Sequence, residues 1–539
     1  MNRRIAVTGI GVLLVTAALG TAGGAARADG YPPTAEAVGG ATLADLPAGQ
    51  DTGYTGHDDG LDINVGDTHG DWDGAPGPGL PVPQEAWAWT QLTDRGAEIR
   101  YVTPVNGACP FVTFTPGGRQ QMTHPSQAFV STPAAFPSTA TVCTLPVPPG
   151  TTGAQIDPAT AGAVTIRPTA NGTVPVPKWP TTGRPAHIAV IGDTGCRVPV
   201  SGPAQNCTPE PQYWPMRGVA DSAATRPTPP DLVIHVGDYI YRSNLSMSQA
   251  QTPTCGPATG GNPHTWGCLI ADFFEPAANL VAQAPIVFVR GNHETCNRSG
   301  NVYFRYQADT LNATACSLLP PQYYTPPVRI NAGALGLLLL DSSCAAAESM
   351  ADCNQTPQQK IDEYTAEFNR VNAGLVQQGD NFLLSHSPIW TINGVTPHGN
   401  PEWVDHNLET SITNTTAHQL DPRINLVLSG HVHLYQMLDF GSLTSPHRPP
   451  QVTVGSSGTE LDQQTWLDNQ MINKDVDGYP VRHLVTRPEF GYAVLRFIPG
   501  ATTPPMTSDT WNLRYFDQFG NPSTGTNCNL VGAQFPNCE

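Results

Sequence analysis

Five short segments of this sequence each end a hydrophobic run and carry residues of the kinds that bind metal ions. The segments read IAVIGDTG, LVIHVGDYIY, IVFVRGNHE, NFLLSHSP and INLVLSGHVH, and their candidate ligands are Asp193, Asp238, Tyr241, Asn292, His386, His431 and His433. Such runs predict buried strands, and strand ends in an α/β sheet share one edge, where ligand-binding crevices form. Carboxylate, amide and imidazole groups from separate strands can converge there. The five segments therefore predict a site for two metal ions.

The hydrophobic pattern changes along the chain and predicts its domains. Short β-patterned pieces separated by turns fill residues 85–175 and predict a small β-sandwich domain. After a proline-rich linker, apolar strands alternate with expected helices at 214–224, 271–283 and 357–378, which is typical of an α/β domain. The expected order is a signal peptide at 1–28, an irregular arm at 29–84, the β-sandwich domain at 85–175, a catalytic domain at 185–500 and a disulfide-closed tail at 501–539.

The first 28 residues have the three parts of a secretory signal peptide. A basic start with Arg3 and Arg4 precedes an apolar stretch that begins at Ile5, and residues 26–28 form an A-x-A cleavage site. Cleavage near Ala28 would give a secreted protein, and the arginine pair leaves both the general and the twin-arginine export routes open. The longest later apolar run, 334–340, is too short to cross a membrane and predicts a buried strand.

The charge balance limits the partners of this protein. The chain has a formal net charge of −18 at pH 7, from 26 basic and 44 acidic residues. Such a surface repels nucleic acids and anionic membranes, so we expect no membrane binding and no nucleic acid binding beyond a possible substrate. A phosphate ester substrate would need a local positive field, which two metal ions would supply. The sequence predicts no oligomeric state.

The 12 cysteines all follow the expected cleavage site, and their number is even. In an oxidising compartment disulfides are the expected state, and the chain has no C-x-x-C pair that would suggest a cysteine-bound metal. Spacing favours pairing each cysteine with its neighbour along the chain. The expected disulfides are 109–143, 196–207, 255–268, 296–316, 344–353 and 528–538.

The order of an aspartate, GDxxY, GNHE, a histidine and GHxH resembles that of the calcineurin-like metallophosphoesterase superfamily. The GDxxY form at residues 237–241 is similar to the purple acid phosphatase branch, and the resemblance covers about residues 188–497. It implies an α/β fold with a metallophosphoesterase-type β-sandwich flanked by helices in α/β/β/α layers. A small all-β domain of immunoglobulin or fibronectin type would precede this sandwich.

The resemblance also implies how the ligands divide between the two metals. Two cations about 4 Å apart need a shared carboxylate to offset their repulsion, and Asp238 would be that bridge. The ligands of the first metal, besides the bridge, would be Asp193, Tyr241 and His433. The ligands of the second metal, besides the bridge, would be Asn292, His386 and His431.

The identity of the first metal depends on a tyrosine. Many superfamily members have a D-x-H motif where this chain has DTG at residues 193–195. Tyr241 is placed to supply the missing ligand, and a phenolate is a hard, anionic donor that favours Fe(III). We therefore expect Fe(III) at the site of Tyr241 and Fe, Zn or Mn at the other site, with the visible colour that the resemblance implies. If Tyr241 only packs at the strand end, Mn or Zn becomes the expected metal.

Several residues are candidates for catalysis and substrate binding. His293 is the candidate general acid, or a hydrogen-bond donor to the substrate phosphate together with Asn292. His398 lies twelve residues after His386 and matches, by position alone, a substrate-side histidine of purple acid phosphatases. Arg242 is a candidate contact for an anionic substrate. The alternatives are a structural role for His293, a surface-loop position for His398 and an ordinary exposed arginine.

These features predict a secreted, dinuclear metal-dependent phosphoesterase that hydrolyses phosphate monoesters by attack of a metal-bound hydroxide, as an acid phosphatase does. A phosphodiesterase or nucleotide pyrophosphatase on the same scaffold is the alternative, because substrate choice depends on loops outside the ligand set. A third alternative is a non-catalytic extracellular binding protein with a degenerate phosphoesterase fold. Such a protein would lack some of the ligands, and the candidate set is complete.

Overall fold

The computed structural model describes residues 85–539 apart from several gaps. The gaps are 105–106, 131–139, 163, 245–263 other than Met247, Thr252 and Cys255, 319–324, 346–352, 442–445, 501–509 and 536. The expected signal peptide and irregular arm lie outside the described residues. The chain divides into two units, Met1–Gln50 and Asp51–Glu539, and all the described residues belong to the second.

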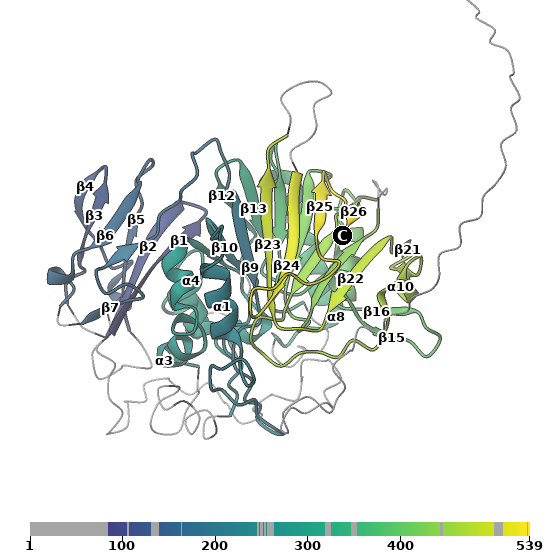
Figure 1. The fold of residues 1–539 in the computed structure, drawn as a ribbon, viewed down its shortest axis with the longest axis horizontal. Helices are drawn as coiled ribbons and strands as arrows, with labels where there is room; N and C mark the ends of the chain where they lie inside the picture. Colours follow the sequence, from purple (N-terminus) through teal and green to yellow (C-terminus); the bar gives the residue numbers. More distant parts are fainter. Residues whose placement is uncertain are drawn as a thin grey trace, which may run out of the picture. The chain divides into compact units, whose positions relative to one another are not determined.

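A mixed sheet of eleven strands, counted over the described residues, forms one half of the fold (Figure 1). Three parallel strands at its centre are almost entirely buried, as expected of apolar runs: β9 (His187–Ile191), β10 (Leu232–His235) and β11 (Ile286–Phe288). The order is β26-β25-β24-β23-β9-β10-β11-β1-β2-β5, with β7 beside β1. The other strands are β1 (Glu85–Thr93), β2 (Gly96–Thr103), β5 (Thr141–Pro146), β7 (Thr165–Arg167), β23 (Gly491–Ile498), β24 (Thr510–Asp517), β25 (Cys528–Val531) and β26 (Asn537–Cys538).

A second sheet contains seven of the described strands, in the order β12-β13-β14-β17-β19-β18-β22. Its central strands β13, β14, β17 and β19 run parallel to one another. The bounds are β12 (Val328–Ala332), β13 (Leu335–Leu339), β14 (Asn381–Leu384), β17 (Ile424–Ser429), β18 (Tyr435–Asp439), β19 (Gln451–Val454) and β22 (His483–Arg487).

The two sheets pack against each other, and helices cover their outer faces. Side chains alternate between the faces of a strand, so that Val190 of β9 and Leu384 of β14 both enter the core between the sheets. Helices α1 (Met216–Ala224), α3 (Trp266–Leu269) and α4 (Ala278–Gln283) and the π-helical turn η5 (Ile270–Phe274) pack on the outer face of the first sheet, where α1 and α4 lie side by side (Figure 1). Helices α8 (Pro357–Arg370) and α9 (His406–Thr413) and the π-helical turn η9 (Val371–Leu375) pack on the second. The expected α/β/β/α layers are confirmed.

Helix α8 illustrates how the sequence sets these elements. The side chain of Thr356 accepts a hydrogen bond from the backbone N–H of Gln359, and the side chain of Gln359 accepts one from the backbone N–H of Thr356. Pro357 occupies the first helical position. Tyr364 and Phe368, one turn apart, are buried against the second sheet. The expected amphipathic helix at 357–378 is thus formed by α8 and η9.

The N-terminal β region is joined to the rest of the fold through a shared sheet. A four-stranded sheet, in the order β4-β3-β6-β8, packs on β1 and β2 to form the expected small sandwich, whose core includes Ala88 and Phe114. Strand β1 also pairs in parallel with β11, where Gln91 lies opposite Ile286. The face of β1 opposite Ala88 carries Trp89, whose ring lies 4.7 Å from that of Phe274 in η5. The four strands are β3 (Phe111–Thr115), β4 (Gly118–Gln121), β6 (Gly153–Ile156) and β8 (Thr173–Val174).

The expected disulfide pairing is confirmed. All six neighbour-to-neighbour bridges are present, and they are Cys109–Cys143, Cys196–Cys207, Cys255–Cys268, Cys296–Cys316, Cys344–Cys353 and Cys528–Cys538. The short elements that remain are η2 (Gln127–Phe129), η4 (Pro158–Thr160), η6 (Asn292–Glu294), α5 (Gly300–Val302), η7 (Tyr303–Gln307), α6 (Ala315–Leu318), β15 (Ile392–Val395), β16 (Pro401–Trp403), α10 (Asp468–Met471), β20 (Asp475–Val476) and β21 (Tyr479–Pro480).

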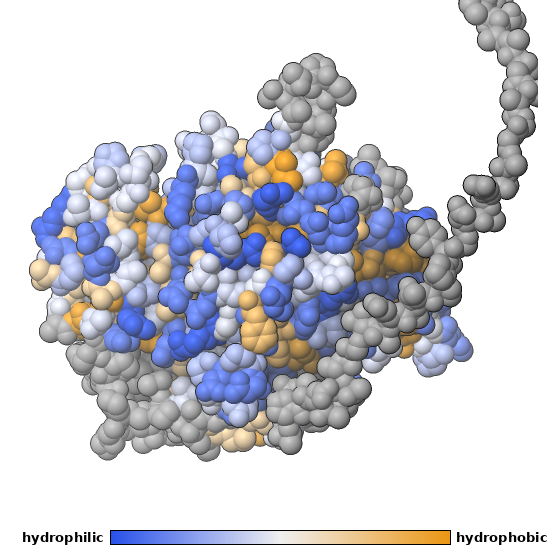
Figure 2. Space-filling model, viewed as in Figure 1, coloured by the Kyte–Doolittle hydropathy of each residue, from blue (hydrophilic) through white to orange (hydrophobic). Residues whose placement is uncertain are grey.

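The surface in Figure 2 is mostly polar, and its apolar residues form small separate groups. Large exposed apolar side chains include Leu318 and Phe519. None of the helices in the described part of the chain has both the length and the apolar character needed to cross a bilayer.

Candidate metal centre

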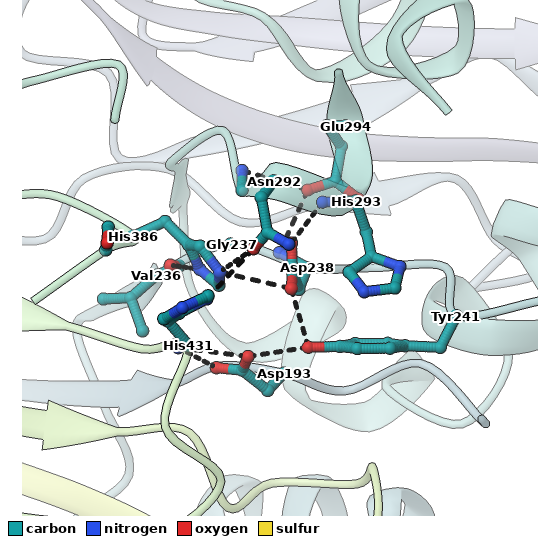
Figure 3. Close-up of polar contacts among 12 residues, drawn as sticks. Asp193, Val236, Gly237, Asp238, Tyr241, Asn292, His293, Glu294, His386 and His431 are labelled. Atoms are coloured by element: carbon teal, nitrogen blue, oxygen red, sulfur yellow. Dashed lines mark hydrogen bonds and ion pairs between the residues drawn. The ribbon is translucent and has the colours of Figure 1, made fainter. Parts of the chain in front are cut away.

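The five sequence segments all end at one edge of the sandwich. Strands β9, β10 and β11 of the first sheet lead into Asp193, Asp238 and Asn292, whereas β14 and β17 of the second sheet lead into His386 and His431. Figure 3 shows these side chains pointing toward one another from separate strands. The expected convergence at strand ends is therefore present, and it combines two sheets rather than one.

The ligand loops have an uncommon backbone. Asp193, Asp238 and His431 have φ angles of 53°, 61° and 72°, in the left-handed region that non-glycine residues rarely adopt. A glycine precedes each of them, and a side chain at Gly430 would collide with the carboxylate of Asp193. The first two loops also pair with each other, because the backbone N–H of Asp193 donates to the carbonyl of Gly237 at 3.0 Å. Such strained conformations persist where the surroundings hold them, which is common at functional sites.

One group of ligands meets at the hydroxyl of Tyr241. The hydroxyl oxygen lies 2.8 Å from Oδ1 of Asp193, 2.7 Å from Oδ2 of Asp238 and 3.2 Å from Nε2 of His433. All four side chains are at most 5% exposed. These are the three residues expected around the first metal, together with the expected bridge.

A second group meets at the side-chain oxygen of Asn292. This oxygen lies 2.9 Å from Nε2 of His386 and 3.1 Å from Nδ1 of His431. Nε2 of His386 is also 3.1 Å from Oδ2 of Asp238. The same carboxylate oxygen of Asp238 therefore faces both groups, as a bridge between two metals must.

The donor set fits a pair of hard or borderline metal ions. It offers two carboxylates, a phenol, an amide oxygen and three imidazoles, and one ligand atom each from Asp193, Asp238 and His386 lies within 4.8 Å of the others. Oxygen and imidazole donors suit iron, zinc and manganese. The same clustering occurs at Cys109, His124 and Cys143, but there the two sulfur atoms are bonded to each other.

The ionisable side chains of this cluster shift one another's pKa values. Burial raises the pKa of Asp193 well above its usual range, and Asp238 adds to this rise while His386 opposes it. Burial acts on Asp238 in the same direction, but the positive charges of His386 and His293 outweigh it and hold its pKa below the usual range. Burial lowers the pKa of His386, yet the two aspartates raise it to about 10. The cluster thus favours a positive charge between its carboxylates, which a metal cation would supply in place of a proton.

Hydrogen bonds hold two of the candidate ligand histidines in place, one through its ring and one through its backbone. Nδ1 of His386 lies 2.8 Å from the carbonyl oxygen of Val236, which directs Nε2 into the site. The backbone N–H of His433 donates to Asp462 at 2.9 Å. Asp462 belongs to none of the five segments, so no motif in the sequence indicated it.

The buried His235 holds the two aspartate loops together. Its Nδ1 accepts a hydrogen bond from the backbone N–H of Gly237 at 3.2 Å, so the proton lies on Nε2, which is 2.9 Å from the hydroxyl of Thr194. Burial keeps the pKa of His235 well below its usual value, and the ring stays neutral. The signal that could have identified it is a polar residue in the middle of an otherwise apolar strand.

His293 lies beside the cluster, whereas two other candidates do not join it. The ring of His293 packs on that of Tyr241, with centroids 3.9 Å apart, and its backbone N–H donates to Oδ1 of Asp238 at 2.9 Å. The guanidinium of Arg242 is fully buried and paired with Asp272 at 2.6 Å. His398 is exposed in the turn between β15 and β16. The substrate-side roles of Arg242 and His398 stay predictions.

Comparison with known proteins identifies the domain. Residues 186–435 match the family model of the calcineurin-like phosphoesterases. The chain contains a calcineurin-like phosphoesterase domain. This domain includes all the candidate ligands, and the superfamily that the motifs resemble is confirmed. No curated protein matches the chain.

Solved structures similar to this chain include a purple acid phosphatase from yellow lupin seeds. The identity is 12%, the match covers 81% of this chain and 71% of that chain, and the TM-score is 0.40. PhoD is also similar, at 12% identity, covering 86% of this chain and 93% of that chain with a TM-score of 0.46. A third is GAP50, the anchor in the inner membrane complex of Plasmodium, at 8% identity, covering 66% and 90% of the two chains with a TM-score of 0.34.

Proposed function

We propose that this protein is a dinuclear metal-dependent phosphoesterase that hydrolyses phosphate monoesters. The observation that carries the proposal is the position of Asp238, whose Oδ2 lies 2.7 Å from the hydroxyl of Tyr241 and 3.1 Å from Nε2 of His386. A carboxylate between two complete groups of donors is what a metal pair requires. A site for one metal would need only one of these groups.

The side chains divide into two sets of ligands around this bridge. The first set is Asp193, Tyr241 and His433, and the second set is Asn292, His386 and His431. When bound, the metal pair would supply Lewis-acid activation of the phosphoryl group and a lowered pKa of water. The protein itself holds the ligand atoms in place, excludes bulk water from the buried carboxylates and supplies a proton donor.

We assign Fe(III) to the set that contains Tyr241, and Fe, Zn or Mn to the other set. The phenol oxygen of Tyr241 is surrounded by Asp193, Asp238 and His433, so a phenolate there would share its ion with two further anionic oxygens. Hard anionic donors favour a trivalent hard cation over a divalent one. The second set has an amide and two imidazoles, which suit a divalent ion.

The proton donor to the departing alcohol is His293 in this proposal. It is buried, follows the ligand Asn292 directly and packs on Tyr241 at the edge of the donor cluster. An imidazole can donate a proton near neutral pH, and such a donor typically contributes about 10²–10⁴-fold to the rate. Asn292 and His293 would also contact the phosphate oxygens.

The test is metal analysis and ester turnover on one sample. We expect two metal equivalents per chain, a visible colour from the iron, and faster hydrolysis of p-nitrophenyl phosphate than of bis-p-nitrophenyl phosphate. Faster hydrolysis of the diester would show that the protein is a phosphodiesterase and not a phosphomonoesterase. If metal-loaded protein hydrolyses neither ester, the proposed enzymatic function is wrong. If the protein is active but colourless and free of iron, only the iron assignment is wrong.

We also propose that the mature protein is secreted after removal of residues 1–28. The six disulfides support this, because such bonds persist in oxidising compartments. Mass spectrometry of protein recovered outside the cytoplasm of the producing cell should give a mature N-terminus at Asp29. A chain that keeps Met1 there would contradict cleavage.

A further inference from the structure

Glu294 is a buried carboxylate next to the metal centre that belongs to neither group of ligands. It is 1% exposed and ends the short helix η6 that begins at Asn292. Its Oε2 accepts from the backbone N–H groups of Gly291 and Asp238, each at 3.0 Å. Its Oε1 accepts from the backbone N–H of Tyr239 at 3.0 Å, and the hydroxyl oxygen of Ser299, which donates to the carbonyl of His293 at 2.6 Å, lies 3.2 Å from the same oxygen. Three backbone N–H groups therefore hold the two oxygens of this carboxylate.

The donors come from two different ligand loops. Asp238 and Tyr239 follow β10, whereas Gly291 follows β11 in the next strand of the same sheet. A return contact completes the connection, because the carboxylate of Asp238 accepts from the backbone N–H of His293 at 2.9 Å. Each loop therefore gives a carboxylate to the backbone of the other, as Figure 3 shows.

This reciprocal pair of contacts leaves little freedom to either loop. A side chain at Gly291 would collide with the carboxylate of Asp238, so the two loops are in close contact. Asp238 has a φ angle of 61°, which its surroundings must hold. With Oδ1 of Asp238 bonded to His293, Oδ2 is the oxygen left to face Tyr241 and His386.

We propose that Glu294 is a positioning residue. Its hydrogen bonds hold the loops of Asp238 and His293 together and so place the bridging oxygen of Asp238 where the metal pair would bind. The proposal rests on the dinuclear function proposed above. It gives Glu294 a structural role, because both of its oxygens accept from backbone N–H groups of the two loops.

Two substitutions of Glu294 test this positioning role. Glu294→Gln keeps the shape but turns one acceptor oxygen into an N–H₂ group that faces backbone N–H donors. Glu294→Asp keeps the charge but is one methylene shorter, so it cannot reach both loops. Glu367→Gln is the matched control, since Glu367 is also a buried glutamate, located on α8 and away from the metal centre.

The measurements are metal affinity of the apoprotein, kcat and KM with p-nitrophenyl phosphate, and hydrogen–deuterium exchange of residues 236–241 and 289–295. We expect both Glu294 variants to lose at least tenfold in metal affinity and in kcat, with a smaller change in KM and faster exchange in both segments. Fold-preserving loss of this size is typical when groups that orient metal ligands are removed. The control should match the wild type in all of these measurements.

Several outcomes would overturn the proposal. Wild-type metal affinity, kcat and exchange in Glu294→Gln would do so, and wild-type behaviour in Glu294→Asp alone would show that charge matters and reach does not. Loss of native circular dichroism in both variants would make Glu294 a residue of the overall fold. If the wild type itself binds no metal, the proposed dinuclear function is wrong. The exchange measurement then still decides whether Glu294 holds the two loops together.

Discussion

Oδ2 of Asp238 lies 2.7 Å from the hydroxyl oxygen of Tyr241, and this contact joins the proposed bridging carboxylate to the residue on which the metal assignment depends. Both side chains are buried. They come from one loop, three residues apart, so a single turn after β10 supplies the bridge and the phenol together. The GDxxY spacing therefore has a direct geometric meaning in this chain.

The first prediction concerns this phenol. Tyr241→Phe removes the oxygen that contacts Asp193, Asp238 and His433, so the iron at that set should be lost first under a chelator and the visible band should disappear. We expect kcat to fall at least about tenfold. Tyr239→Phe is the control, because the Tyr239 hydroxyl donates to the carbonyl of Val289 outside the ligand set. An absorption spectrum of Tyr241→Phe that is identical to the wild type would contradict a tyrosinate ligand.

The second prediction concerns the charge of the cluster. Asp193→Asn removes an anion from a fully buried site and leaves an amide that ligates weakly, so the first metal should not bind and activity should fall at least about a hundredfold. Asp231→Asn is the matched control, because Asp231 accepts from the backbone of Ala186 and His187 at the opposite end of the strands. Metal content by mass spectrometry and turnover of p-nitrophenyl phosphate give the answer. Two tightly held metals in Asp193→Asn would refute the assignment of this ligand.

The candidate ligand positions were predictable because each one lies within a few residues after an apolar strand. His386 and His431 follow β14 and β17 by two residues, a spacing that the sequence makes visible. Strand patterns do not say which strands are neighbours, so the division of the five segments between two sheets was not predictable. The parallel pairing of β1 with β11, which joins Gln91 to Ile286, is a long-range contact of the same kind.

The supporting residues were harder to predict than the ligands. Asp462 contacts the backbone N–H of His433, and a backbone contact places no requirement on a local motif. Arg242 follows a candidate ligand in sequence, and its expected substrate contact stays a prediction, while the structure adds that its side chain is buried and pairs with Asp272. Burial of an arginine with its partner depends on α3 and η5, which the position of Arg242 in the chain does not reveal.

The third prediction concerns the disulfide that follows the GNHE segment. Cys296–Cys316 closes 20 residues that begin just after Glu294, and its loss should destabilise the protein by about 3 kcal/mol through loop entropy. The double variant Cys296→Ser/Cys316→Ser should also weaken metal binding. Cys528→Ser/Cys538→Ser is the comparison, since it removes a bridge between β25 and β26 in the tail and should lower stability alone. Equal metal affinity in both double variants would show that the first bridge does not support the ligand loop.

The fourth prediction concerns Glu367, a buried glutamate on α8 that pairs with Arg370 at 2.5 Å. Burial raises its pKa from 4.5 to about 7, against the effect of Arg370. Between these values the folded state binds more protons than the unfolded state, so the free energy of unfolding should decrease as pH rises through this window, by at most about 3 kcal/mol. Glu367→Gln should reduce the dependence in urea denaturation between pH 5 and pH 7.5, whereas Asp362→Asn, exposed on the same helix, should retain it in full. A Glu367→Gln curve parallel to the wild type would mean that another group titrates there.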